Sequence, residues 1–238
     1  MVKNMTRKSV FIGCILLLIG SLVFGMGCQN RPAPASAQEQ SPLDYFAVYE
    51  QGSYRLRDIP WGASVEQAQQ ILADSGREMG FFRSTTPTQQ VYLVTTPIQF
   101  SQPEMSGVQW LYFEQGQLSA AQLYFYTTAF ATEQFPLGGS QEQPTITVDY
   151  SLLSPESDLN ITFSVLTEEQ LPQITETLES QLAERYPEQT VRPDGAESLL
   201  NGGYWQGGES NMFSASSMAY TPDGIPYAIV LAISGIPE

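Results

Sequence analysis

The pattern of hydrophobic and polar residues predicts a chain built mainly from β-strands. Runs rich in β-branched and aromatic residues predict strands over 91–100, 108–113, 118–128, 145–152, 159–166, 204–206, 212–220 and 227–233. Residues 53–63 predict a strand that leads to a turn at Pro60 and Gly62. The run 118–128 has the clearest period of two, because Ala121, Leu123 and Phe125 alternate with Gln122, Tyr124 and Tyr126. It predicts one buried face and one exposed face that carries tyrosines.

Two segments have the helical period instead. Val65, Ala68, Ile71 and Leu72 form one apolar stripe after Ser64, which with Gln67 makes a capping box. We therefore expect a helix over 65–75.

The second helix carries Leu171, Ile174, Leu178 and Leu182 on one face and ends at Pro187. Its start has two readings. Thr167 with Gln170 forms a capping box, which would place Pro172 inside the helix, whereas Pro172 at the first helical position is the easier geometry.

The last predicted strand, 227–233, is apolar on both faces, which is typical of a strand in the middle of a covered sheet. Strands at 108–113 and 118–128 form a hairpin around a four-residue loop, 114–117. The whole pattern predicts an α+β fold, in which two helices pack on antiparallel sheet. A weak repeat of helix, connection and antiparallel strands suggests two diverged tandem modules, 44–135 and 144–238.

The N-terminal segment has the three parts of a bacterial secretion signal. Basic residues precede an apolar run over 10–27, and Cys28 follows it directly. The segment resembles the lipobox of bacterial lipoproteins, although Gly25 stands where that family usually has Leu. The resemblance implies a signal peptide over 1–27 and a lipid on Cys28. Residues 28–43, rich in Pro, Ala, Ser and Gln, form a flexible tether, and 44–238 form the body.

Two other readings of this segment stay open: an uncleaved membrane anchor and ordinary signal cleavage. All three place the body outside the cytoplasm. We expect a protein attached to the cell membrane through the lipid on Cys28.

The amino-acid composition limits which partners and which catalytic groups the protein can use. Beyond Cys28 the chain has neither Lys nor His, and seven arginines stand against all 25 acidic residues. Such a surface repels nucleic acid and anionic lipid headgroups. Without His, Lys or another Cys, the usual general bases, amine nucleophiles, thiol nucleophiles and zinc ligands are missing. We expect no metal, no cofactor and no enzymatic activity.

Carboxylate chemistry, as in glycoside hydrolysis, is the one catalytic class that the composition still allows. Asp58 near Trp61 and Glu209 near Trp205 are the candidate pairs. The alternative is that Asp58 and Glu209 are ordinary solvated carboxylates on the surface of an acidic protein.

Aromatic residues supply the candidate binding surface. Trp61, Trp205 and Tyr204 are its predicted members, and Tyr204 and Trp205 lie among glycines 202, 203, 207 and 208. They would form a platform for a sugar or a peptide. The alternative is that the tryptophans pack in the core.

The turn 59–64 (IPWGAS) before the first helix and the hairpin 112–118 (YFEQGQL) resemble small α+β modules of secreted bacterial proteins. Examples are the small lipoprotein of the outer-membrane assembly machine and the β-lactamase inhibitor proteins. The resemblance implies a module that binds protein partners. We expect a lipid-anchored binding or interaction protein of the cell envelope, with a protein or glycan partner. The alternatives are a carboxylate-dependent carbohydrate-active enzyme and a solute-binding component of a transporter.

Overall fold

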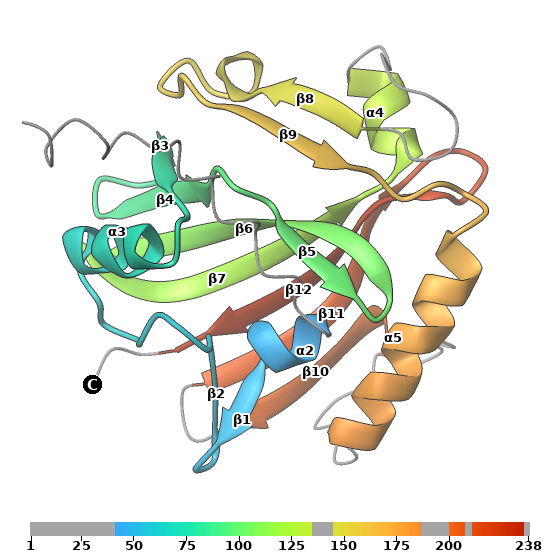
Figure 1. Cartoon of the computed structure of the whole chain (residues 1–238), viewed down its shortest axis with the longest axis horizontal. Coiled ribbons are helices and arrows are strands. Elements are labelled where there is room, and N and C mark those ends of the chain that lie inside the picture. The colour runs from blue at the N-terminus through green and yellow to red at the C-terminus, as the bar shows by residue number, and fades with distance from the viewer. Residues whose placement is uncertain (1–40, 135–144, 187–199, 208–210, 236–238) are drawn as a thin grey trace, which may run out of the picture. The chain divides into compact units, whose positions relative to one another are not determined.

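An eight-stranded antiparallel sheet organises the part of the chain that the computed structural model describes, residues 41–134, 145–186, 200–207 and 211–235 (Figure 1). Neighbouring strands follow the order β10-β11-β12-β7-β6-β4-β3, and β5 pairs with the other end of β6. Its strands are β3 (Met79–Ser84), β4 (Gln89–Val94), β5 (Ile98–Ser101), β6 (Glu104–Glu114), β7 (Gln117–Tyr126), β10 (Asn201–Gly207), β11 (Asn211–Tyr220) and β12 (Pro226–Ser234). The predicted signal peptide and most of the predicted tether lie outside the described residues.

The remaining elements cover the two faces of this sheet. They are β1 (Val48–Glu50), β2 (Ser53–Arg55), β8 (Thr145–Asp149), β9 (Asn160–Ser164), α2 (Pro42–Tyr45), α3 (Val65–Asp74), α4 (Thr128–Gln134), α5 (Leu171–Arg185) and the 3₁₀ turn Tyr150–Leu152. One core joins the first face to α2, α3, α5 and the β1–β2 hairpin. A second core joins the other face to α4 and the β8–β9 hairpin. The predicted α+β class with antiparallel sheet is confirmed, and α2 and α4 are additional to the two predicted helices.

Strand β12 lies in the middle of the sheet and is buried on both sides. Ile229, Leu231 and Ile233 belong to the first core, whereas Ala228 and Val230 belong to the second. This confirms the prediction of a doubly covered strand. Because β12 pairs with β7, strands from both predicted modules share one sheet, and all the described residues fall within one compact unit.

Both predicted helices begin as local chemistry dictates. The Ser64 side chain accepts a hydrogen bond from the Gln67 main-chain N–H (3.2 Å), and the Gln67 side chain accepts one from the Ser64 N–H (2.8 Å). In front of α5 the Thr167 N–H donates to the Gln170 side chain (2.9 Å), but that pair forms a turn. The helix itself begins at Leu171, one residue before the start that the second reading expects, and Pro172 lies in its first turn.

Several predicted strand boundaries are wrong. The strand predicted from residue 53 ends at Arg55, and the one predicted over 145–152 ends at Asp149, where the 3₁₀ turn Tyr150–Leu152 begins. The run 91–100 is divided into β4 and β5, which pair with different stretches of β6. The β6–β7 hairpin has a two-residue turn, Gln115 and Gly116, both with positive φ. Strand β3 was not predicted, because Gly80 interrupts its hydrophobic pattern. The structure requires a glycine there, since a Cβ at position 80 would lie 2.2 Å from the Leu159 side chain.

A buried polar chain holds α2 against the sheet. The Tyr45 hydroxyl donates to Gln109 Oε1 on β6 (2.8 Å) and accepts from the Arg77 guanidinium. Arg77 also pairs with Asp58 (2.6 Å), so the chain runs from the centre of the sheet to the surface. The Gln109 Nε2 group is buried without a hydrogen-bond partner among the described residues. This polar path crosses the first core and fixes the start of the body.

Asn211 ties the β1–β2 hairpin to the large sheet. Its Nδ2 donates to the main-chain oxygens of Tyr54 and Ser234 (both 2.8 Å), and its Oδ1 accepts from the Tyr54 N–H. The Asn211 side chain thus satisfies both main-chain groups of Tyr54, as a neighbouring strand would.

We predict that Leu231→Ala lowers the free energy of unfolding by about 3 kcal/mol, because it leaves a cavity in the middle of the first core. Met218→Ala on β11, which is 43% exposed, should change it by less than about 1 kcal/mol. Urea unfolding followed by tryptophan fluorescence measures both. Equal effects of the two substitutions would contradict the central position of β12.

Candidate functional site

The structure separates the three aromatic residues that were predicted to form a surface. Trp205 is buried in the first core, where it stacks on Phe213 with ring centroids 5.0 Å apart and donates its indole N–H to the Tyr186 main-chain oxygen (2.9 Å). Tyr204 is the next residue of the same strand, so it points to the opposite face. It is half-buried there. Trp205 is therefore a core residue and contributes nothing to a binding surface.

Trp61 lies apart from both. Its indole N–H donates to the Tyr54 main-chain oxygen (3.0 Å), and its ring lies so close to Gly235 that a Cβ there would be 2.6 Å from it. This half-buried ring packs against the first core. The packing alternative considered for the tryptophans thus accounts for both Trp61 and Trp205.

Of the two candidate carboxylates, the structure describes only Asp58. Asp58 is bound to Arg77. Glu209 lies outside the described residues. Within the described ranges, no three acidic, histidine or cysteine residues come together as metal ligands would.

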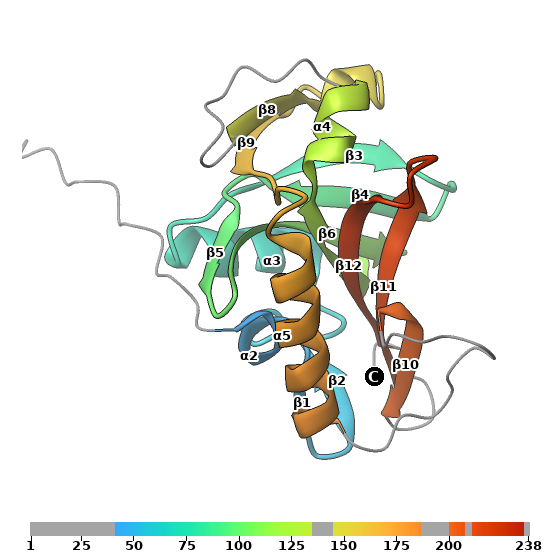
Figure 2. The same cartoon turned by 90° about the vertical axis from the view of Figure 1, so that its right-hand side faces the viewer.

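The second face of the sheet is covered only in part. The β8–β9 hairpin and α4 pack over the buried side chains of β4, β6 and the first part of β12, while no described helix or strand lies against the outer side of β10 and β11 (Figure 2). We call the uncovered part the open face. Its residues are Tyr112, Gln122, Tyr124, Tyr204, Met212, Ser214, Ser216, Met218, Ala232 and Ser234.

Strand register places these residues side by side. Tyr204, Ser214, Ala232 and Gln122 are direct partners across four adjacent strands. Three strand spacings separate Tyr204 from Gln122, which is about 14 Å. Small side chains thus form the floor between the Tyr204 ring on one side and the tyrosines of β6 and β7 on the other.

Two tyrosines hold the Gln122 amide in place. The hydroxyls of Tyr112 and Tyr124 both donate to Gln122 Oε1, at 2.6 Å and 2.7 Å. The Tyr124 ring packs in turn against Trp110 (4.9 Å between centroids) and stacks on Tyr126 (5.5 Å). The amide is therefore fixed, and its Nε2 group makes no hydrogen bond to any described residue.

Electrostatics keep both hydroxyls protonated. Burial raises the pKa of Tyr112 and of Tyr124 above that of a free tyrosine, and the nearby Arg83 guanidinium lowers both pKa values by a smaller amount. The two phenols therefore act as donors at neutral pH, and Gln122 Oε1 acts as their shared acceptor.

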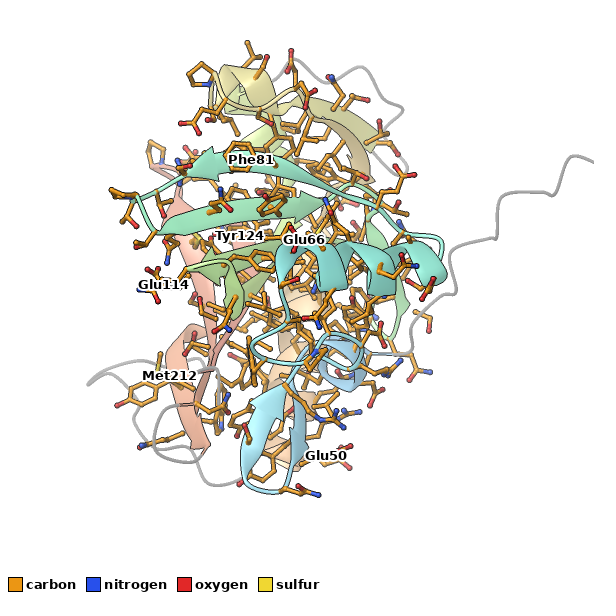
Figure 3. The ribbon with its side chains drawn as sticks, turned by 90° about the vertical axis from the view of Figure 1, so that its left-hand side faces the viewer. Glu50, Glu66, Phe81, Glu114, Tyr124 and Met212 are labelled. Atoms are coloured by element: carbon orange, nitrogen blue, oxygen red, sulfur yellow. The ribbon has the colours of Figure 1, made fainter. Side chains whose placement is uncertain are left out.

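The residues of the open face carry no charge, on a chain with 25 acidic residues, and the charged group near them is the Arg83 guanidinium beside Tyr112 and Tyr124. Exposed thioethers, Met212 at 44% and Met218 at 43%, lie on its β11 strand, and Figure 3 shows Met212 projecting outward from the ribbon. Tyrosine, serine and amide side chains with adaptable methionines are the residues that protein-binding surfaces use for rigid contact area and flexible hydrogen bonding. The arrangement is suited to a flat partner surface.

The sequence indicated part of this face. The period of two in β7 correctly placed Gln122 and Tyr124 opposite the buried Ala121, Leu123 and Phe125. It was wrong for Tyr126, which is buried because α4 and β9 cover it; its ring stacks on Phe130 (4.4 Å) and lies 5.1 Å from Phe163.

The chain matches no protein-family model, no curated protein and no solved structure. In the described part of the chain, no helix has both the length and the apolar character needed to cross a bilayer.

We predict that Gln122→Met lowers the free energy of unfolding by about 1–3 kcal/mol, because it leaves two half-buried hydroxyls without their acceptor. In the Gln122→Met background, Tyr112→Phe should cost much less than it does in the unchanged chain. Urea unfolding of the four proteins gives the coupling energy. Strictly additive effects would show that the shared hydrogen bond contributes nothing.

Proposed function

We propose that this chain is a lipid-anchored interaction protein of the bacterial cell envelope, outside the cytoplasm, and that its open face binds a protein partner. The observation that carries the proposal is the uncharged open face on a strongly acidic chain. Another protein can approach there without electrostatic repulsion. Tyr112, Tyr124 and Tyr204 supply its rigid contact area, and Gln122 offers a fixed amide donor.

The N-terminal sequence supports the anchor. Basic residues, an apolar run and Cys28 follow one another in the order that lipoprotein signals use. Two or more acyl chains on one cysteine provide the double signal that stable membrane attachment needs. The many carboxylates keep the body away from anionic headgroups, so we expect the partner to meet it at a distance from the bilayer.

A protein partner fits the open face better than a glycan does. The tyrosine rings do not lie free as a platform, because Tyr124 already packs against Trp110 and Tyr126. Adaptable Met212 and Met218 are suited to the side chains of another protein. No described observation favours the alternatives of a hydrolase or a solute-binding component of a transporter.

Cys28→Ser should abolish incorporation of radioactive palmitate and release the protein from the membrane fraction. The reason is that the cysteine thiol is the expected site of acylation. Labelling of cells followed by fractionation measures both. Cys14→Ser provides the matched control and should change neither; unchanged labelling in Cys28→Ser would refute the anchor.

A photo-crosslinking amino acid in place of Met212 should capture a discrete protein adduct in cells that express the full chain. The same amino acid in place of Leu152, which is 71% exposed on the β8–β9 connection, should not capture it. Ser214→Glu, which puts a charge in the middle of the open face, should remove the adduct at Met212. Gln69→Glu on the exposed side of α3 should leave it unchanged.

Two results would count against the proposal: adducts of equal strength from Met212 and Leu152, or an adduct that consists of glycan. The first would show unspecific contact, and the second would assign the open face to a carbohydrate.

A further inference from the structure

A groove runs between α5 and the tip of the β5–β6 hairpin, which lie side by side in both views (Figures 1 and 2). It encloses about 510 Å³, within the range of small-ligand sites. It is lined by Ser101, Gln102, Pro103, Glu104, Gln170, Gln173, Ile174, Thr177 and Gln181. None of these residues belongs to the open face, so the groove is a separate site.

We propose that this groove binds an extended peptide segment through its main chain. The lining carries four primary amides, and each amide offers both a donor and an acceptor. That combination matches the alternating N–H and C=O groups of an extended peptide. The buried Ile174 supplies an apolar floor for the peptide's side chains.

Three of the amides have hydrogen-bonding groups to offer. The side chains of Gln102 and Gln173 are exposed and make no hydrogen bond to any described residue. Gln170 uses its Oε1 to accept from the Thr167 N–H (2.9 Å) and hydroxyl (3.2 Å), which orients the amide and leaves its Nε2 to donate. The groove therefore presents groups to a ligand from both of its walls.

The fourth amide sets the width of the groove. Gln181 Oε1 accepts from the Ser41 hydroxyl (2.7 Å), and Gln181 Nε2 donates to the Gln102 main-chain oxygen (3.1 Å). The bond to Gln102 joins the hairpin tip to α5 at one end, and the bond from Ser41 holds the Gln181 amide in place. A ligand then meets walls that are already in place, which lowers the entropic cost of binding.

The spacing along α5 sets the length of the ligand. Gln170, Gln173, Thr177 and Gln181 follow one side of the helix over eleven residues. At 1.5 Å per residue this is about 16 Å. An extended chain covers that distance in about five residues.

A smaller pocket of about 50 Å³ continues the groove past the start of α5. It shares Glu104 and Gln170 with the groove and is further lined by Ser106 and Ser164. Its size suits one small side chain, such as that of alanine or serine. The peptide would therefore enter this pocket with a small residue at one end.

The lining disfavours the other ligand classes. It contains no aromatic ring on which a sugar could stack, and Glu104 is its single carboxylate, so it lacks the pair that glycoside hydrolysis requires.

The test is an NMR titration of the ¹⁵N-labelled full chain in detergent micelles with a blocked pentapeptide of alternating alanine and serine. We expect shifts of the side-chain NH₂ signals of Gln102, Gln170 and Gln173. Because the recognition is through the main chain, the fully N-methylated peptide of the same sequence should cause none. Gln173→Ala should weaken binding about tenfold, whereas Gln69→Ala on α3 should not change it.

Shifts with a chito-oligosaccharide of five sugars but not with the peptide would overturn the proposal in favour of a glycan. Absence of shifts with the peptide, or equal shifts with its N-methylated form, would also overturn it. Ser214→Glu on the open face should leave the titration unchanged. Failure of this proposal is therefore distinguishable from failure of the proposed function.

Discussion

The pairing of β12 with β7 is the interaction on which the rest of the structure depends. It joins strands that come from opposite halves of the body 44–238, Gln117–Tyr126 and Pro226–Ser234, into one sheet. Ile229, Leu231 and Ile233 then complete the core under α5 and the β1–β2 hairpin, while Ala228 and Val230 complete the core under α4. Without this pairing each half would keep one uncovered apolar face, which neither half could bury alone.

The same strand also explains why the described helices and strands leave one part of the sheet uncovered. Its outward residues change from Ala228 and Val230, which are buried, to Ala232 and Ser234, which are half-buried. The covering layer ends where the side chains become small and polar. Small and polar side chains do not require burial for stability, so this surface is available to bind another molecule. The hydrogen bonds from Tyr112 and Tyr124 to Gln122 keep its side chains ordered.

Elements that depend on neighbouring residues in the sequence were predicted correctly. Ser64 and Gln67 marked the start of α3, and the two-sided apolar pattern placed β12 in the middle of a sheet. Contacts between residues that lie far apart along the chain could not be predicted from the sequence. Nothing near Tyr126 shows that α4 and β9 will cover it, and nothing near Gln122 shows that Tyr112 will share its amide oxygen. The aromatic surface failed for a local reason: alternation along β10 sends Tyr204 and Trp205 to opposite faces, and only one of them remains accessible.

The bonds around α2 have a mechanical consequence. Three side chains at the start of the described body are bound to two other elements. Ser41 binds Gln181 on α5, Asp44 binds Arg185 at the end of α5 (2.6 Å), and Tyr45 binds Gln109 on β6. Tension applied at the N-terminal end would therefore be shared between the helix and the centre of the sheet. Through Gln181 the force would also act on the tip of the β5–β6 hairpin, before it could separate β1 from the body. In the lipid-anchored protein that we propose, these bonds would spread a pull on the tether over α5 and the sheet.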